Sequence, residues 1–247
     1  MEAIHPKNYG FDLIYEDNHL LVVNKPGGTL VQGDATGDEP ISEKAKRFLK
    51  DKYNKPGNVF CGVVHRLDRP VSGVLVLAKT SKGLERMNQV FRQRKITKVY
   101  WAITKRKPKE KEGKLAHWLR KDSKKNKTTA FDRPQPDAQQ AELKYRVLGQ
   151  LNEHTLIEVK PLTGRPHQIR VQLAEMGCPI RGDVKYGFPK PDPDGTIHLH
   201  ARRLHFIHPV KKEPLLLTAP LPVTDFWEQF LKLDDFKVSS RRLDFLH

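Results

Sequence analysis

The sequence predicts an α+β fold with a mixed, mostly antiparallel central sheet flanked by helices. Segments with strand and helix patterns mix along the chain without the regular alternation that produces a parallel α/β sheet. The chain has 247 residues, which is enough for a substantial core, and no internal repeat or linker divides it. We therefore expect a single domain over residues 1–247, with its core at about 13–231 and a basic insert at about 105–127.

The first expected elements are two strands and a helix. Residues 13–15 and 19–24 are rich in apolar and β-branched side chains, and the polar turn at 16–18 joins them. Lys25-Pro26-Gly27-Gly28 ends the second strand. Residues 41–53 have helical spacing. The apolar side of that helix consists of Ala45, Phe48 and Leu49.

Two short apolar segments follow, and both have the composition of buried strands. They cover residues 59–64 and 74–78 and enclose a turn at 65–73. Residues 81–94 then predict a helix with Ser81 as its N-cap, because Leu84, Met87, Val90 and Phe91 recur at helical spacing. Residues 96–104 alternate as a strand does.

The second half of the chain predicts further strands and two helices. Proline near the start and Gly177 after the end bound the first of these helices. The expected elements are a strand pair at 141–148 and 155–159, a helix at 166–176, a strand at 198–208 and a short helix at 224–231.

Positive charge is the strongest feature of the composition. The formal net charge is +16, which indicates a polyanionic partner, nucleic acid first and an anionic membrane second. Residues 105–127 contain eleven Lys or Arg against three acidic residues, a net of +8. This window is either a flexible arm that lies along a phosphate backbone or a solvated loop.

Several function classes have little support. The sequence has no apolar run near 18 residues, no apolar signal segment at its start and no glycine-rich phosphate loop of the usual spacing. Cys61 and Cys178 lie far apart among apolar residues, which is typical of buried thiols in a reducing cytosol. We expect a cytoplasmic protein that needs no metal or nucleotide cofactor and no membrane.

The first chemical signal is the segment from His65 to Gly73. It places Asp68 between Arg66 and Arg69 on a turn between apolar runs, with a proline two residues further on. An enzyme that uses a single nucleophile or base needs such rigid placement of one ionised group. The alternative is a surface turn in which Asp68 pairs with a neighbouring arginine.

Two further signals lie at Tyr100 and around Arg170. A strand tyrosine usually packs in the core, but one that faces a cleft could stack on a base. In the helix at 166–176 we expect Ile169, Leu173 and Met176 to face the core. His167 and Arg170 share the neighbouring face, so the Arg170 fork would point outward. Arg165 stands near the helix start, where anions are favoured. The alternative is ordinary surface arginines on an amphipathic helix.

Together these segments resemble the RluA family of RNA pseudouridine synthases, from about Tyr15 to about Pro222. The resemblance rests on ordered motifs, namely Asn24-Lys25-Pro26-Gly27-Gly28, His65-Arg66-Leu67-Asp68 with Ser72-Gly73, Lys98-Val99-Tyr100, Gly164-Arg165-Pro166-His167-Gln168-Ile169-Arg170, and Leu199-His200-Ala201 with His208-Pro209. Val71 and Gln172 depart from the residues that the family often has there. These departures concern subfamily and substrate rather than chemistry.

The resemblance implies an RNA pseudouridine synthase that isomerises a uridine in structured rRNA or tRNA. It implies that Asp68 is the essential aspartate, that Tyr100 stacks on the target base, and that Arg170 pairs with Asp68. We expect no separate N-terminal RNA-binding domain before the matched region, and no obligate protein partner is implied. The residues expected to bind RNA are Arg66, Arg69, Arg165, His167, Arg202, Arg203, Lys105, Arg106 and Lys107.

Two rival functions remain open at this point. A non-catalytic RNA-binding protein would have the same electrostatics. A metal-dependent nuclease would need a ligand set, and four histidines cluster near the last strand. On a regular strand His198, His200 and His208 share a face and His205 does not, but their spacing fits no compact ligand set.

Overall fold

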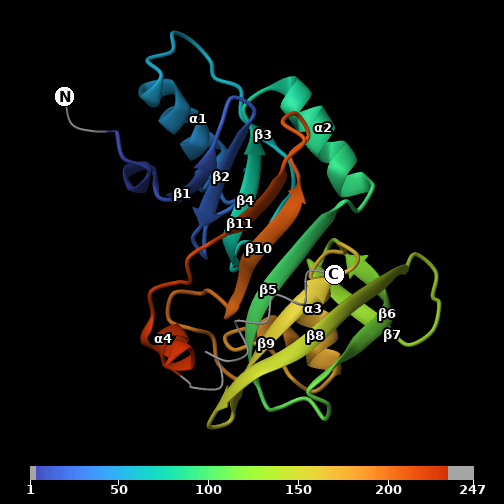
Figure 1. Cartoon of the computed structure of the whole chain (residues 1–247). Coiled ribbons are helices and arrows are strands. Elements are labelled where there is room, and N and C mark those ends of the chain that lie inside the picture. Colours follow the sequence, from blue (N-terminus) through green and yellow to red (C-terminus); the bar gives the residue numbers. More distant parts are fainter. Residues whose placement is uncertain (1–3, 233–247) are drawn as a thin grey trace. The chain divides into compact units, whose positions relative to one another are not determined.

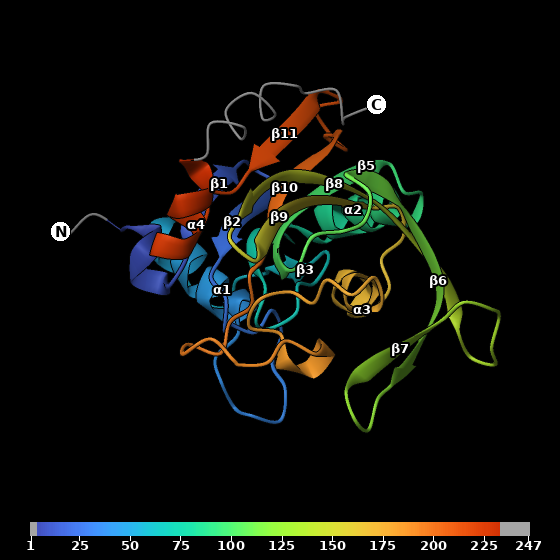
Figure 2. The same cartoon turned by 90° about the horizontal axis from the view of Figure 1, so that it is seen from below.

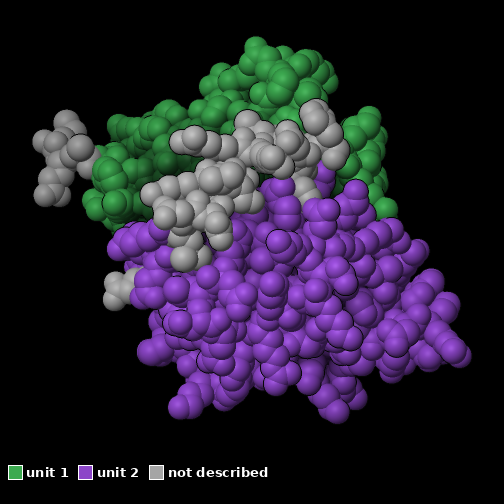
Figure 3. Space-filling view, turned by 60° about the horizontal axis from the view of Figure 1, so that its bottom comes forward, with its two compact units in different colours: residues 1–97, 201–220 green, residues 98–200, 221–247 purple. Residues whose placement is uncertain are grey.

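The computed structural model describes residues 4–232. The chain packs as two compact units, Met1–Thr97 with Ala201–Pro220 and Lys98–His200 with Leu221–His247, which Figure 3 distinguishes by colour. We call them unit 1 and unit 2. The expectation of a single domain is not tested by this division and stays a prediction.

Unit 1 is built on antiparallel strand pairs. Its strands follow the order β1-β2-β4-β10, with β11 paired to β10 and β3 paired to β4 (Figure 1). β2 lies antiparallel to both β1 and β4, and its apolar side chains are buried on both faces of the sheet. The bounds are β1 Asp12–Glu16, β2 Leu20–Lys25, β3 Gly62–Val63, β4 Ser72–Ala78, β10 Leu199–Ile207 and β11 Pro214–Thr218.

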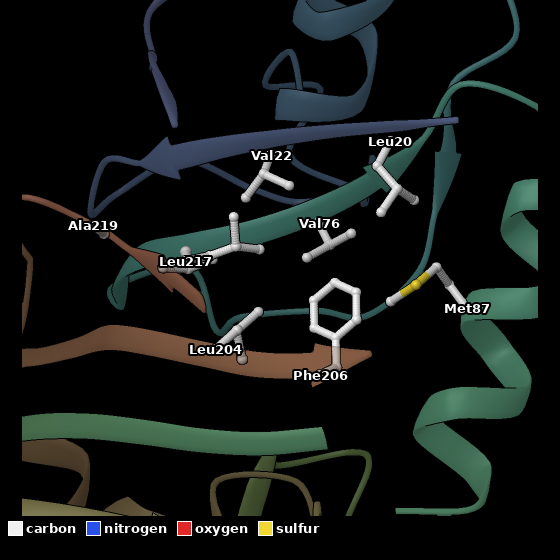
Figure 4. Close-up of a cluster of buried hydrophobic side chains, with 9 residues drawn as sticks. Leu20, Val22, Val76, Met87, Leu204, Phe206, Leu217 and Ala219 are labelled. Carbon is white, nitrogen blue, oxygen red and sulfur yellow. The ribbon is translucent and has the colours of Figure 1, made fainter. Parts of the chain in front are cut away.

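Two helices complete unit 1, and both confirm the sequence prediction. α1, Ile41–Lys52, buries the expected face, which contains Phe48. α2, Ser81–Arg92, contributes Met87 to a core cluster with strand residues such as Val76 and Phe206 (Figure 4). The predicted cap of α2 is wrong by one residue. Thr80 is the N-cap, because its hydroxyl accepts the backbone N–H of Gly83 at 3.0 Å.

The predicted buried strand at 59–64 is largely wrong. Only Gly62 and Val63 form a strand, both are partly exposed, and Phe60 is 46% exposed. β4 already has β2 and β10 as neighbours, so this segment pairs only with Leu77 and Ala78 at the end of β4. The strand at 74–78 is confirmed and fully buried.

In the described part of unit 2, five strands follow the order β5-β9-β8-β6-β7. Every neighbouring pair in this series is antiparallel. The predicted strands at 96–104, 141–148 and 155–159 are confirmed. The bounds are β5 Ile96–Lys105, β6 Glu112–Asp122, β7 Lys127–Phe131, β8 Gln139–Leu151 and β9 His154–Pro161.

The prediction of a flexible arm or solvated loop at 105–127 is wrong for most of that window. β6 and β7 form a regular hairpin, and β6 continues onto β8 from Glu112 to Leu119. Charge obscured a strand pattern, since Leu119 is buried while the neighbouring Arg120 is exposed. The tip of the hairpin, residues 120–127, lies beyond the pairing with β8 and remains exposed.

Two helices pack in unit 2. α3, Gln168–Glu175, lies beside β6 and β7 (Figure 2) and is followed by Gly177 at φ +80°, as the sequence predicts. α4, Asp225–Leu231, starts after Thr224, which caps it, and buries Trp227 and Phe230 against β5, β8 and β9 side chains. A short 3₁₀ turn, η2, covers Val184–Tyr186.

The α+β class with a mostly antiparallel sheet is confirmed. Buried positions alternate with more exposed ones in the first half of β8, while β2, β4 and β9 are buried almost throughout. Among the described residues, no helix is both long and apolar enough to cross a membrane.

Candidate active site

Asp68 lies on the loop between β3 and β4, and the residues around it hold that loop in place. The His65 ring stacks on Phe91 at 4.9 Å, and its Nε2 atom accepts the backbone N–H of Val76 at 3.0 Å. Val71 donates its N–H to the carbonyl of Asp68 at 3.0 Å, which closes a turn. Asp68 itself is half-buried. Contacts before and after Asp68 therefore hold the short loop that carries its carboxylate.

Gly73 lies at the start of β4, directly after this loop, and its backbone closely approaches β10. Its φ is +116°, and a Cβ atom at this position would lie 2.3 Å from the carbonyl oxygen of Ala201 in β10. Only glycine fits such a contact. The sequence motif Ser72-Gly73 thus has a steric cause.

Lys25 is the first residue near the site that the sequence analysis missed. Its side chain is fully buried, and Nζ donates to the carbonyl oxygens of Pro26, Thr29 and Arg69 at 2.9, 2.8 and 3.2 Å. Burial lowers the pKa of Lys25 to about 7, although the charge of Asp68 acts in the opposite direction. A lysine between an apolar strand and a Pro-Gly turn is the signal that could have identified it.

The turn after Lys25 is bound to the residue after Asp68. Gly28 donates its N–H to the carbonyl of Arg69 at 2.8 Å, and Arg69 Nε donates to the carbonyl of Gly28 at 3.0 Å. The exposed Arg69 guanidinium also meets Asp38 at 2.5 Å. Arg66 is exposed. The binding of RNA by these two arginines stays a prediction.

Tyr100 lies on β5 and is half-buried. It pairs with Val159 of β9, which in turn pairs with Tyr145 of β8, so the three side chains form a row on one face of the strands. Two residues earlier, Lys98 donates to the carbonyl of Thr163 at 3.2 Å. This contact joins the strand that carries Tyr100 to the segment before α3.

Arg170 lies on α3, and the prediction that its guanidinium points outward is wrong. Its side chain is 6% exposed, and it meets Asp183 with two hydrogen bonds, Nε to Oδ2 at 2.7 Å and Nη2 to Oδ1 at 2.8 Å. A buried guanidinium needs a charged and hydrogen-bonded partner. Asp183 is not among the residues predicted from the sequence, because it lies thirteen residues away outside any periodic pattern. The pairing of Arg170 with Asp68 stays a prediction.

The segment before α3 is bound to β7 and β8. His167 adopts φ +54°, and its Nδ1 atom lies 2.7 Å from the hydroxyl of Tyr186. That hydroxyl also accepts the backbone N–H of Thr128 at 2.8 Å. Arg165 donates from Nε to the carbonyl of Gln140 at 3.1 Å. His167 therefore precedes α3 instead of standing on its surface.

The remaining predicted RNA-binding residues lie within β10 and at or just after the end of β5. Arg202 is half-buried and donates to the carbonyl of Ala219, and burial lowers its pKa to about 10. Arg203 is half-buried beside it. Lys105 Nζ lies 3.6 Å from Glu153, while Arg106 and Lys107 are exposed. The binding of RNA by these five residues stays a prediction.

The histidines near β10 have separate contacts. His198 Nδ1 lies 2.8 Å from Asp192, and the ring stacks on Trp227. His200 is fully buried and contacts Trp227 edge-on, while His208 Nε2 lies 3.0 Å from Asp17. Within residues 4–232, no three His, Cys, Asp or Glu side chains are grouped so that they could hold a metal ion.

The site residues named above lie within or close to a region that matches a known family. The family model described as RNA pseudouridylate synthase matches residues 19–175. The chain belongs to this family. The matched region includes Asp68, Tyr100 and Arg170, while Asp183 lies after it.

Relatives from bacteria and animals agree with this assignment. The chain is 34% identical over 221 residues to ribosomal large subunit pseudouridine synthase C of Vibrio cholerae, which covers 85% of this chain and 65% of that relative. It is 31% identical over 251 residues to the mitochondrial pseudouridylate synthase RPUSD4 of Xenopus tropicalis, covering 86% and 77%. The chain thus spans slightly less than two thirds of the bacterial relative.

A solved structure has the same fold. Human RNA Pseudouridylate Synthase Domain Containing 4 superposes with a TM-score of 0.74 and 28% identity, covering 91% of this chain and 92% of that one. The resemblance to the family that the motifs indicate is therefore confirmed. The individual roles of Asp68, Tyr100 and Arg170 stay predictions.

Proposed function

We propose that this chain is an RNA pseudouridine synthase that isomerises a uridine in structured RNA to pseudouridine. Membership of the family across residues 19–175 carries the proposal, since that region contains the loop of Asp68. Ribosomal RNA is the first candidate substrate because the bacterial relatives bear names of ribosomal large subunit enzymes, and transfer RNA is the second. The cytoplasm is the proposed compartment, and the two free, buried cysteines support a reducing environment.

The reaction needs one ionised group and a route for one proton. The N1–C1′ bond of the uridine breaks, the base turns, and C1′ rejoins the base at C5. The proton on C5 then leaves and N1 gains one, so the product is an isomer and nothing is oxidised. In this proposal Asp68 either attacks C1′ or removes a proton from the sugar. Both routes require the carboxylate to be fixed in place, as the hydrogen bonds at His65 and Val71 support.

A base in folded RNA must first leave its stack. Extrusion costs a few kcal/mol, and stacking on an aromatic ring returns about 1–3 kcal/mol. We assign the stacking to Tyr100, whose half-buried ring is part of the row with Val159 and Tyr145. Phosphate contacts supply the remaining affinity, and the expected contacts come from exposed arginines and lysines such as Arg66 and Lys107.

Substitution Asp68→Asn tests the proposal. Site-resolved mapping of pseudouridine in ribosomal and transfer RNA, from cells with and without the protein, identifies the target first. The purified variant should then convert no uridine in that RNA, while its RNA affinity stays equal or rises because a negative charge is lost.

Asp51→Asn is the matched control, since it removes one exposed carboxylate of α1 and should leave conversion unchanged. Undiminished conversion by Asp68→Asn would refute the catalytic assignment. RNA binding without conversion by the wild type would instead support a non-catalytic RNA-binding protein. Strand cleavage that a chelator abolishes would support the nuclease alternative.

A further inference from the structure

We propose that Asp183 is a positioning residue for the isomerisation and that it acts through Arg170. The inference rests on the proposed function, because it concerns how Arg170 is presented to Asp68. Asp183 lies at the start of η2, after the end of α3, and is 1% exposed. Its carboxylate and the Arg170 guanidinium form one buried, doubly hydrogen-bonded pair.

Asp183 binds one particular edge of the Arg170 guanidinium. A guanidinium carries five N–H donors along two edges. Asp183 accepts from Nε and from one hydrogen of Nη2, which is the side edge. The hydrogens of Nη1 and the second hydrogen of Nη2 form the end edge, which points away from Asp183. We propose that this end edge serves the predicted pairing of Arg170 with the Asp68 carboxylate.

The plane of the Arg170 guanidinium is also fixed in its orientation. The Arg170 group lies over the Tyr186 ring, 5.1 Å from its centroid. Tyr186 is fixed in turn through its hydroxyl, which lies 2.7 Å from His167 Nδ1 and accepts the N–H of Thr128. Asp183 therefore limits rotation of the guanidinium within its plane, and Tyr186 limits the tilt of that plane.

One short turn supplies both groups. The carbonyl of Asp183 accepts the backbone N–H groups of Tyr186 and Phe188, each at 3.1 Å. Gly182 precedes the turn at φ +82°, where a Cβ atom would lie 2.8 Å from the carbonyl oxygen of Thr196. The sharply turned backbone thus brings the Asp183 carboxylate and the Tyr186 ring into contact with the same Arg170 guanidinium.

A purely structural ion pair is the competing explanation, and kinetics separates the two. A structural pair affects the folded fraction, whereas a positioning residue changes kcat of the folded enzyme and leaves KM for RNA nearly unchanged. The experiment compares Asp183→Asn, Arg170→Lys and the double variant under single-turnover conditions. We expect kcat to fall at least about tenfold in Asp183→Asn. We expect the double variant to be no slower than Arg170→Lys alone, because residues that act as a unit are not additive.

Glu158→Gln is the matched control for loss of a buried charge pair. Glu158 is 4% exposed and meets Arg146 at 2.9 Å, in the same unit but on β9 and β8. This variant should lose a similar amount of thermal stability and keep its kcat. Independent, multiplicative losses in the double variant, or an equal loss of kcat in Glu158→Gln, would overturn the inference.

Asp183→Glu keeps the experiment decisive if Asp183→Asn does not fold. The longer side chain retains the charge but shifts the guanidinium, so kcat should fall while RNA affinity and the thermal midpoint stay close to the wild type. Full activity in Asp183→Glu would overturn the inference. If the wild type converts uridine and Asp68→Asn does not, then an active Asp183 variant refutes this inference alone. If the wild type converts no uridine, the proposed function fails as well.

Discussion

Two buried basic side chains near the candidate residues are hydrogen-bonded in different ways, and the chemistry of each side chain explains the difference. Lys25 ends in a compact ammonium with three donors, and three backbone carbonyl groups surround it. Arg170 ends in a planar fork, and the two oxygens of one carboxylate match it. An exchange of lysine and arginine at either position would therefore leave donors without acceptors.

At Gly73 we predict that alanine is not tolerated. Gly73→Ala should lower the free energy of unfolding by about 3 kcal/mol or more, because its Cβ meets the rigid backbone of Ala201 and φ is positive. Gly28→Ala is the control, since Gly28 also has positive φ but open space around its Cβ position. It should cost about 1 kcal/mol. Equal losses in urea unfolding of the two variants would show that strain alone, without the steric contact, sets the cost.

For Lys25 we predict a stability that depends on pH. Burial lowers its pKa to about 7 in the folded state, while the unfolded chain keeps a value near 10.4. Between these values the unfolded state binds more protons, so this residue makes the wild type more stable as pH rises. The effect approaches about 1.4 kcal/mol per pH unit at most.

Urea unfolding of wild type and Lys25→Met at several pH values from about 6.5 to about 9 checks this linkage. The stability difference between the two proteins should shift in favour of the wild type as pH rises above about 7. Lys82→Met, which changes an exposed lysine of α2, should show no such trend. A constant difference for Lys25→Met would mean that the three carbonyl groups keep the ammonium charged across this range.

At the scale of elements, the sequence predicts segments whose pattern is local. α1, α2, β8 and β9 show clear periodicity, and their positions are confirmed to within a few residues. β6 was hidden by charge, because the exposed positions of a strand that faces solvent can all be basic. The short β3 is the opposite case. Residues 59–64 have the apolar composition of a strand, but only Gly62 and Val63 pair with β4.

The candidate site could be predicted only as far as its motifs extend. The loop of Asp68 and the helix of Arg170 were identified, but the partner Asp183 and the carbonyl groups around Lys25 depend on how distant segments pack. Arg170 points inward, and not outward as predicted, for the same reason. An amphipathic pattern cannot show that a later turn covers the polar face of α3.

For the β6–β7 hairpin we predict a role in RNA affinity and none in chemistry. Lys124 and Lys125 are exposed at its tip. The double substitution Lys124→Ser/Lys125→Ser should weaken RNA binding and reduce the slope of log affinity against log salt by about 1 to 2, since up to two phosphate contacts are lost. Single-turnover kcat at saturating enzyme should not change.

Lys50→Ser/Lys82→Ser is the control for this prediction. It removes two exposed lysines from helices of unit 1 and causes the same change in net charge. Its effect on the salt slope should be much smaller. If both double variants weaken binding equally, then the net charge of the chain, and not the hairpin, determines the affinity.

At the scale of the whole molecule, the match to the family extends across both units. Residues 19–175 include most of the first segment of unit 1 and most of unit 2. Asp68 belongs to unit 1, and Tyr100 and Arg170 belong to unit 2. The motifs that indicate one activity are therefore distributed over both compact units, which explains why no single segment of the sequence identifies the function.

The net charge of +16 predicts that salt raises the thermal stability of the free protein and reduces the additional stability that bound RNA gives. In the free protein, like charges repel each other, and a rise from about 20 mM to about 200 mM NaCl shortens the range of that repulsion. Its thermal midpoint should therefore rise. RNA stabilises the folded state by mass action, and this increment should shrink over the same range because phosphate contacts weaken.

Thermal melts with and without RNA measure both quantities in one series. Sucrose is the control, because it favours the compact state without screening charge, so it should raise both midpoints and leave the RNA increment intact. A fall in the midpoint of the free protein with NaCl would contradict the prediction. It would mean that ion pairs such as Lys79 with the largely buried Glu16, at 2.6 Å, contribute more to stability than self-repulsion removes. The charge would then be arranged to hold the fold together, and its use for RNA would have to come from exposed residues such as those at the hairpin tip.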